Sequence, residues 1–338
     1  MGRTRGTTFL DIISQTLAAA CGNLLQPAVL FFALGLIAAM ARSDLALPRD
    51  IAKTLSLILM LCIGFKGGVE ARAHGLDTTF LTAAGLGLAL SALMPLPAYL
   101  LLRRAGLPAL TAAATAAHYG SVSVVTFAAA QSYLASVGQA PGGYMSAVLA
   151  LMETPALLTA IAIAAFADRG SSDRAPAGKL AHEVLLNAAS VILIGSFLIG
   201  LATGPSGGAK LATFTGPVFQ GLLCLFLLDL GVKAGRQLIE ARGVTLPVVA
   251  MGFILPLLGA ATALGLGHLA GLAGGDLAAL AVLAGSASYI AAPAAMSLAL
   301  PRADAGVYLT LSLGVTFPFN LCLGIPLYAL AATWLSGL

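Results

Sequence analysis

The sequence predicts an all-α polytopic membrane protein with about ten transmembrane helices in a 5+5 inverted repeat. Three observations lead to this fold class. Hydrophobic residues make up 59% of the chain and charged residues only 9%, whereas a soluble domain carries about 25% charged residues. Apolar stretches of the roughly 20 residues that a bilayer-spanning helix needs follow one another along the chain. Short motifs of the first half recur in the same order in the second half.

The first half contains five predicted spans. The second span is short, because it lies between Lys53 and Lys66, and it can continue past Gly67. Residues 105–152 carry no Asp, Glu, Lys or Arg and are too long for one helix, and the sequence VGQAPGGY (137–144) within them is typical of a turn. We therefore place the spans near residues 24–41, 51–64, 78–102, 109–135 and 144–167.

A polar stretch, DRGSSDRAPAGKLAHE (168–183), separates the two halves and reads as a solvated linker. The sequence thus predicts a first five-helix repeat over 1–167, a cytoplasmic linker over 168–183 and a second, inverted repeat over 184–338. The spans of the second repeat are expected near residues 184–202, 211–234, 244–272, 277–300 and 306–335.

Four pairs of matching features support the repeat. They lie 163–167 residues apart and keep the same order. Because five spans per half is an odd number, the second half enters the membrane from the opposite face, an architecture common among secondary transporters. The paired features are LGL (34–36) with IGL (199–201), GFKGG (64–68) with GVKAG (231–235), GSVS (120–123) with GSAS (285–288), and Tyr144 and Pro155 with Tyr308 and Pro318.

The distribution of Lys and Arg predicts the orientation. The N-terminus and the loops that follow even-numbered spans carry five of these residues, and the remaining loops carry twelve. The more basic side is expected to be cytoplasmic, which places both termini outside and the linker inside. The net charge of +4 is small and lies in short loops, so it favours topology control over nucleic-acid binding.

The chemistry is expected where the fourth and ninth spans break. Both contain polar, glycine-containing cores, HYGSVS (118–123) and GSASY (285–289). A break there would expose backbone N–H groups at the start of a half-helix, which attract an anion. The alternative for each serine is close helix packing or a bond to its own backbone. The candidate substrate ligands are Gly120, Ser121, Ser123, Gly285, Ser286, Ser288 and Tyr289.

Oxygen atoms in the same region could hold a coupling ion. The candidates are Ser123, Thr126, Glu153 and Ser288. A carboxylate inside a span is a functional candidate, so Glu153, just before Pro155, could coordinate a cation, carry a proton or pair with a base; the alternative is an interfacial carboxylate in water. Asp229 and Lys233 lie one turn apart and are expected to form an internal ion pair.

No enzyme signature is visible. HExxH, GxSxG and Walker A patterns are absent, and the four cysteines show no zinc-binding spacing. We therefore expect that the protein is not an enzyme and that it binds no cofactor and no metal ion other than possible Na⁺. With no ATP-binding motif, transport would be coupled to an ion or proton, or passive.

Through nearly all ten spans the chain resembles the sodium-dependent bicarbonate transporter family first known from cyanobacteria. The resemblance implies a bacterial inner-membrane protein, a homotrimer in the lipid bilayer, and a core in which the fourth and ninth spans hold bicarbonate and Na⁺. It also implies a PII-like regulatory partner. The most specific stretches are LILMLCIGFKGGVEAR (57–72), YGSVSVVTFAAA (119–130), ALMETPALLTAIAIA (150–164), GLLCLFLLDLGVKAG (221–235), VLAGSASYIAAPAAMSLALP (282–301) and GVTFPFN (314–320).

The departures from the family concern the sodium site and the linker. The ninth-span motif of the cyanobacterial proteins reads like SSSDISGPP, with an aspartate implicated in sodium binding; here SASYIAAPA (286–294) has Tyr289 at that position. The family's GAVSGSTM-like motif has alanine at Ser121 and serine at Val125. A neutral phenol is a poor substitute for a carboxylate as a cation ligand, so we expect weak dependence on Na⁺ or none, unless the bound anion itself pairs with Na⁺ or Glu153 approaches the site. The Tyr289 hydroxyl could also bind the anion directly. The linker is shorter than the family's cytoplasmic loop.

The leading hypothesis from the sequence is a secondary permease for a small anion, with bicarbonate first. One alternative is an organic-anion carrier of the bile-acid/sodium symporter type, for which a larger apolar cavity would be the sign. Another is a membrane sensor that kept this fold but no longer transports.

Overall fold

The computed structural model describes residues 24–75, 77–167, 188–240 and 244–337. These residues form an all-helical structure, 83% helix with no β-strand among them, which confirms the predicted all-α class for the described part of the chain. The predicted turn at residues 137–144 is also found, between two helices. The predicted linker at 168–183 lies outside the described residues.

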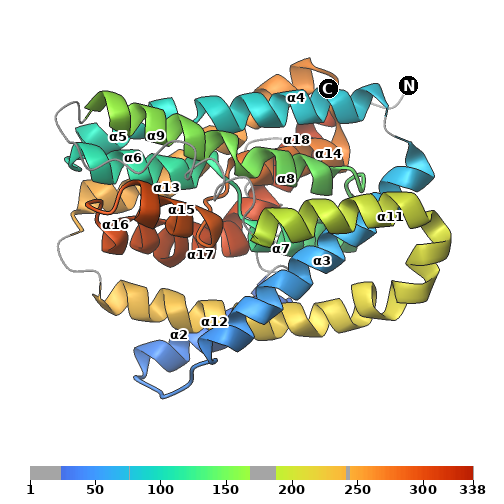
Figure 1. The fold of residues 1–338 in the computed structure, drawn as a ribbon, viewed down its shortest axis with the longest axis horizontal. Coiled ribbons are helices and arrows are strands. Elements are labelled where there is room, and N and C mark those ends of the chain that lie inside the picture. The colour runs from blue at the N-terminus through green and yellow to red at the C-terminus, as the bar shows by residue number, and fades with distance from the viewer. Residues whose placement is uncertain (1–23, 76, 168–187, 241–243, 338) are drawn as a thin grey trace, which may run out of the picture.

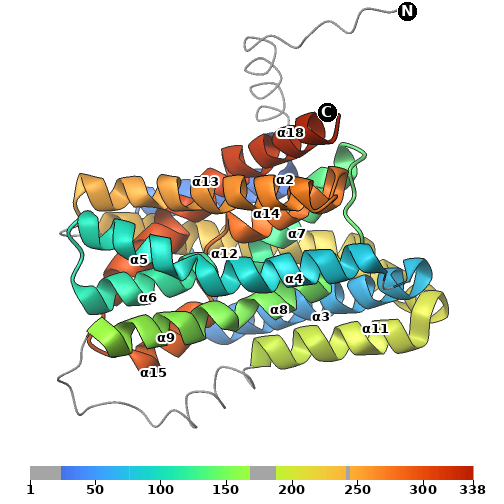
Figure 2. The same ribbon diagram turned by 90° about the horizontal axis from the view of Figure 1, so that it is seen from above.

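The helices pack in two groups (Figures 1 and 2). In the first, which we name the panel, α2 packs along α12 and α3 packs along α11. Figure 1 shows α2 and α12 in the lower part of the view, with α3 crossing diagonally. The panel helices are α2 (Pro27–Met40), α3 (Arg49–His74), α11 (Ala188–Thr213) and α12 (Phe219–Glu240), with the π-helical turn η1 (Phe214–Val218) joining the last two.

The second group, which we name the core, holds the other helices. Several of them are halves of longer apolar segments that bend at a proline or at a short non-helical stretch, as at Pro95 and Pro155. The core helices are α4 (Thr78–Leu93), α5 (Pro95–Arg104), α6 (Ala109–Gly120), α7 (Val124–Ser136), α8 (Met145–Glu153), α9 (Pro155–Ala167), α13 (Leu246–Leu269), α14 (Gly274–Ala284), α15 (Ala291–Ala299), α16 (Ala305–Leu309), η2 (Thr310–Thr316), α17 (Phe317–Phe319), η3 (Asn320–Gly324) and α18 (Ile325–Ser336).

Six helical segments of the described chain are long and apolar enough to cross a membrane. The sequence predicts ten spans, and the difference has identifiable causes. The described part of the first span, α2, has only 14 residues, and the fourth and ninth spans are each divided into shorter helices. The sixth and seventh form one 50-residue segment. The six segments are Arg49–Ala73, Thr78–Arg104, Met145–Ala164, Val191–Glu240, Leu246–Leu269 and Ala305–Ser336.

The 50-residue segment does not run straight. Gly204 interrupts it with φ 58° and ψ −153°, a backbone conformation that favours glycine, and Pro205 follows. Figure 1 shows the chain turning back at the right of the view, so that α11 and α12 run on different levels. The predicted second span is also longer than expected, because α3 continues through Gly67 to His74.

The two helix pairs of the panel are held together by glycines that let backbones touch. A Cβ atom at Gly35 would collide with the carbonyl oxygen of Leu228, and one at Gly231 with that of Phe32. In the other pair, a Cβ at Gly200 would collide with the carbonyl oxygen of Phe65, and one at Gly68 with that of Phe197. Gly35 and Gly200 are 165 residues apart, as are Phe32 and Phe197. Both pairs therefore use the same close contact of small residues that is common between membrane helices.

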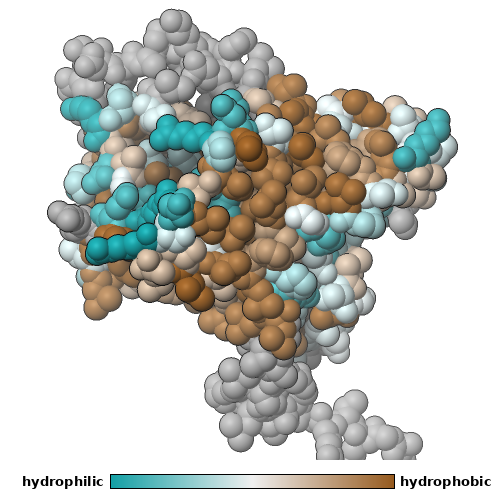
Figure 3. Space-filling view, turned by 90° about the horizontal axis from the view of Figure 1, so that it is seen from below, coloured by the Kyte–Doolittle hydropathy of each residue, from teal (hydrophilic) through white to brown (hydrophobic). Residues whose placement is uncertain are grey.

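The outer surface suits a lipid environment. Large hydrophobic side chains stand exposed, among them Leu25, Phe166, Leu246 and Leu269. Figure 3 shows a broad hydrophobic area on the face seen from below, with hydrophilic residues gathered toward the sides. A continuous apolar surface of this extent is rare on a soluble monomer, and together with the six apolar segments it indicates an integral membrane protein.

Candidate functional site

The candidate site lies where two interrupted helices meet. The α6 helix ends at Gly120 and α7 begins at Val124, while α14 ends at Ala284 and α15 begins at Ala291. The prediction that both spans break at their GSxS motifs is therefore confirmed. We name the two non-helical segments, residues 121–123 and 285–290, the crossing.

Hydrogen bonds join the two segments of the crossing. The Ser123 amide donates to the Ser286 hydroxyl at 3.0 Å, and the Ser288 amide donates to the carbonyl oxygen of His118 at 2.8 Å. Backbone groups that leave a helix inside a membrane protein must find such partners. In the crossing, each broken helix thus provides hydrogen-bond partners for backbone groups of the other.

Serine hydroxyls accept hydrogen bonds from the first turn of the second half of each broken helix. Ser123, at φ −105° and ψ 110°, is the N-cap of α7, and its hydroxyl accepts a hydrogen bond from the Thr126 amide at 3.1 Å. The Ser288 hydroxyl accepts one from the Ala292 amide in α15 at 3.2 Å. Serine is preferred at the N-cap, as at Ser123, because its side chain satisfies an N–H group that the helix leaves open. In α15 the N-cap is Ile290, and Ser288 reaches the Ala292 amide from two residues before it.

A small cavity lies at the crossing, and we name it the central cavity. Its volume is about 10 Å³, which is room for about one water-sized group. Four predicted site residues line it, namely Ser123, Glu153, Ser288 and Tyr289. The first residues of both half-helices, Val124 and Ala291, line it as well, as do Met60, Val122 and Ile290. The first residues of two helices and one acidic residue therefore line the same space.

Glu153 is the only carboxylate that lines the central cavity within the described part of the chain. It lies at the end of α8 and is 2% exposed. Burying a carboxylate is costly unless a cation, a proton or hydrogen-bond donors compensate its charge. The interfacial position in water that the sequence left open for Glu153 is therefore wrong.

Tyr289 forms part of the wall with its ring packed edge-on against Phe317, the ring centroids 5.1 Å apart. Its hydroxyl lies beside Ser123 and Thr126 but makes no hydrogen bond of good geometry. A buried hydroxyl without a partner is unfavourable, so this group is available to a ligand.

The remaining predicted residues support the cavity from outside. The Ser121 hydroxyl donates to the Glu153 carbonyl oxygen at 3.2 Å, and the Ser286 hydroxyl donates to the Leu283 carbonyl oxygen at 2.8 Å. The Thr126 hydroxyl donates to the Ser123 hydroxyl at 2.9 Å.

The two glycines of the predicted set meet other helices. A Cβ at Gly120 would lie 2.5 Å from Pro95, and one at Gly285 would lie 2.9 Å from the carbonyl oxygen of Pro256. Both contacts are closer than real Cβ atoms make, so these positions need glycine for packing. All nine predicted site residues thus lie at or next to the crossing, and four of them face the cavity.

Sequence reasoning missed a polar group behind the crossing. The Asn320 side chain donates to the Gly285 carbonyl oxygen at 2.7 Å, and Tyr328 donates to the Asn320 side-chain oxygen at 3.0 Å. Asn320 is 1% exposed. A buried amide within an apolar span was the signal that could have found it. Met60 was also missed, because an apolar residue in a span carries no such signal.

A much larger cavity adjoins the central one, and we name it the large cavity. Its volume is about 550 Å³, and α3, α12 and α15 contribute most of its lining. Met60, Tyr289, Ile290 and Ala291 line both cavities, so they form the partition between them. A ligand at the crossing would therefore enter or leave past Tyr289.

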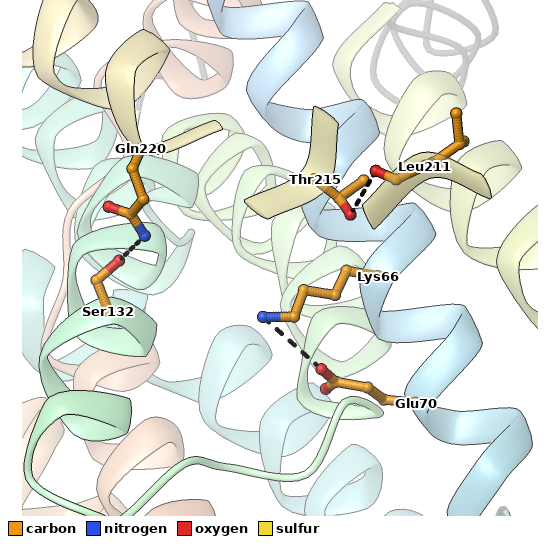
Figure 4. Close-up of polar contacts among 6 residues, drawn as sticks. All are labelled: Lys66, Glu70, Ser132, Leu211, Thr215 and Gln220. Atoms are coloured by element: carbon orange, nitrogen blue, oxygen red, sulfur yellow. Dashed lines mark hydrogen bonds and ion pairs between the residues drawn. The ribbon is translucent and has the colours of Figure 1, made fainter. Parts of the chain in front are cut away.

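A third cavity, the polar cavity, has a volume of about 190 Å³ and shares no lining residue with the central cavity. Figure 4 shows the lining side chains of Lys66, Ser132, Thr215 and Gln220. It also shows Glu70, a carboxylate oxygen of which lies 3.8 Å from Lys66 Nζ. Gln220 of α12 donates to the Ser132 hydroxyl of α7 at 3.0 Å (Figure 4), which links panel and core on this side.

The expected ion pair in α12 is confirmed and lies away from the central cavity. Lys233 Nζ is 2.6 Å from an Asp229 carboxylate oxygen. Asp229 is buried, while the Lys233 side chain is 45% exposed and lines the large cavity. The pair therefore neutralises a buried carboxylate within one helix.

A family model described as the Na⁺-dependent bicarbonate transporter superfamily matches residues 27–333. No curated protein matches the chain. The matched region covers all the helices of the panel and nearly all of the core, including both segments of the crossing.

Proposed function

Since the chain belongs to the Na⁺-dependent bicarbonate transporter superfamily, we propose that it is a secondary permease for a small anion, with bicarbonate as the leading substrate. The observation that carries this proposal is the crossing, where the N-termini of α7 and α15 face the central cavity. Helix N-termini attract anions through their free N–H groups and dipoles.

The anion is held at the two half-helix starts in a state in which the central cavity is wider than the one water-sized space of this conformation. Val124 and Ala291, the first residues of α7 and α15, both line the central cavity. The Tyr289 hydroxyl supplies an uncharged donor from the partition. A small planar oxyanion, which accepts several hydrogen bonds at once, suits this set of donors.

The position of Glu153 in the lining of the central cavity supports a co-transported cation. An anion beside a buried carboxylate is repelled unless a positive charge lies between them. We propose that Na⁺ occupies this position, with the Glu153 carboxylate and the Ser123 and Ser288 hydroxyls as ligands. The sequence alone predicts weak Na⁺ dependence unless the bound anion pairs with Na⁺ or Glu153 approaches the site, and the place of Glu153 in the lining of the central cavity supports the second exception.

Transport proceeds by movement of the core against the panel. The large cavity lies beside Arg49 and Lys53, on the side that the charge distribution predicts to be cytoplasmic. We therefore interpret this conformation as open to the cytoplasm, with the polar cavity on the opposite side. The matched glycine contacts of the α2–α12 and α3–α11 pairs support a 5+5 inverted repeat, whose halves exchange conformations in such carriers.

Assembly and location follow as further proposals from the family. We expect a homotrimer in a bacterial inner membrane, with both termini outside. A monodisperse monomer in lipid nanodiscs would contradict the trimer. A PII-like regulator would bind the cytoplasmic side, and co-purification with a tagged chain tests this.

The proposal is tested by uptake into proteoliposomes from a panel of radiolabelled anions. The assay is run at alkaline pH, where dissolved CO₂ is scarce, with protein-free liposomes as the blank. Bicarbonate uptake above the blank is the expected result. Uptake of another anion in its place would exclude bicarbonate as the substrate but would still support a permease. Binding without any flux would favour a sensor.

A further inference from the structure

The large cavity is far larger than a small inorganic anion needs. Its volume of about 550 Å³ lies within the range of about 300–1,000 Å³ that is usual for pockets of drug-sized molecules. Most of its wall is apolar, with Leu57, Met60, Leu157, Phe226, Leu230 and Leu313 among the lining residues. Water in contact with such a wall forms few hydrogen bonds, so an apolar ligand would displace it favourably.

One end of the large cavity is positively charged. Arg49 and Lys53, one turn apart on α3, line it and are exposed. Within the described residues no carboxylate lines it. Lys233 also lines it, but its charge is compensated by Asp229 at 2.6 Å. The excess charge is therefore that of Arg49 and Lys53, which favours a negatively charged ligand.

The distance between the charged and apolar parts limits the shape of the ligand. Lys53 and Met60 are seven residues apart on the same helix, a rise of about 10 Å at 1.5 Å per residue. Met60 and Tyr289 mark the inner end, at the partition. A molecule with its anionic group at Lys53 and an apolar body about two rings long would reach the partition.

We propose that the large cavity binds organic anions with an apolar body, such as aromatic carboxylates. Their charge lies at Arg49 and Lys53, and their rings lie against Met60, Phe226 and Leu230. Such a ligand covers the partition at Tyr289 and blocks the path to the central cavity. The binding itself does not depend on the proposed function; only the consequence, competition with the transported anion, rests on it.

The test is equilibrium dialysis of radiolabelled 2-naphthoate against the full chain in phosphatidylcholine nanodiscs, with protein-free nanodiscs as the blank. No gradient and no bicarbonate are present. We expect saturable binding, at least tenfold tighter than that of benzoate because the second ring buries more apolar surface. The neutral 2-naphthamide should bind at least tenfold more weakly than 2-naphthoate.

Variants locate the site. Lys53→Gln should weaken 2-naphthoate binding severalfold, and Ala294→Phe, which places a ring in the cavity, should weaken it at least tenfold. Lys66→Gln makes the same charge change in the polar cavity and should leave binding unchanged. All three are compared only after gel filtration shows the wild-type profile.

The proposal is overturned if 2-naphthoate binds no better than to protein-free nanodiscs. It is also overturned if 2-naphthamide binds equally well, or if Lys53→Gln and Lys66→Gln have the same effect. Failure of bicarbonate uptake, with 2-naphthoate binding intact, would remove the proposed function and leave this site in place.

Discussion

Replacing Glu153 with glutamine tests the proposed role of the only carboxylate at the central cavity. The substitution keeps the size of the side chain and removes its charge. Glu153 is buried and lines a cavity of about 10 Å³, and the proposal places the cation about 4 Å from its carboxylate. At that separation two unit charges attract by about 4 kcal/mol at an effective dielectric constant of about 20. Since about 1.4 kcal/mol is a factor of ten, the half-saturating Na⁺ concentration should rise at least hundredfold.

The assay is the initial rate of bicarbonate uptake into proteoliposomes as a function of external Na⁺, with choline keeping the ionic strength constant. Glu153→Asp keeps the charge and should recover part of the Na⁺ affinity. Asp229→Asn removes another buried carboxylate, one that does not line the central cavity, and should leave the Na⁺ dependence unchanged. If Glu153→Gln shows the wild-type Na⁺ dependence, the reasoning that places the cation at Glu153 is refuted.

Three further predictions concern single groups. Tyr289→Phe should raise the half-saturating anion concentration about tenfold, because the hydrogen bond from the hydroxyl stabilises the bound anion by about 1–2 kcal/mol. An unchanged uptake curve would show that the hydroxyl does not contact the anion. Gly35→Ala should lower thermal stability in nanodiscs, since its Cβ collides with the Leu228 carbonyl group, whereas Gly221→Ala meets nothing within 4 Å and should be neutral or stabilising. Asn320→Leu leaves the Gly285 carbonyl oxygen without its donor and should destabilise the fold by about 1–3 kcal/mol; equal melting temperatures for this variant and the wild type would argue against that contact.

The sequence was sufficient to predict the class of the fold and the position of the breaks. Both follow from local chemistry. The apolar segments carry too few charges for a soluble surface, and the Gly-Ser motifs within two of them interrupt the helix. Ser123 and Ser288 were chosen because their hydroxyls could bind an oxyanion or Na⁺, and the structure shows both lining the central cavity, where each hydroxyl accepts a hydrogen bond from an amide of the following helix.

The arrangement of the cavities could not be predicted, because it depends on contacts between distant segments. The approach of Glu153 to Ser123 and Tyr289 depends on how α8 packs beside the crossing, which no local pattern encodes. The sequence alignment of GFKGG (64–68) with GVKAG (231–235) was also wrong by one helical turn. By its contacts, Gly231 corresponds to Gly68 and not to Gly64, since a motif with glycines four residues apart aligns equally well in two registers.

Panel and core could not be distinguished by hydropathy, because the mean hydropathies of their apolar segments overlap. Asn320 could have been found as a buried amide in a span, but its partner, the Gly285 carbonyl oxygen, could not. The large cavity arises from small residues such as Ala52, Ala291 and Ala295 on separate helices, and alanine is common throughout this sequence.

The most direct test of the central claim is uphill accumulation of bicarbonate driven by Na⁺ alone. Proteoliposomes are filled and surrounded with equal concentrations of radiolabelled bicarbonate at alkaline pH, and Na⁺ is then added outside against choline inside. A carrier that holds the anion at the crossing and Na⁺ at Glu153 predicts a transient rise of internal bicarbonate above the external concentration, absent in Glu153→Gln. If internal bicarbonate stays at the external concentration while the wild-type protein is folded and inserted, coupled transport at this site is contradicted.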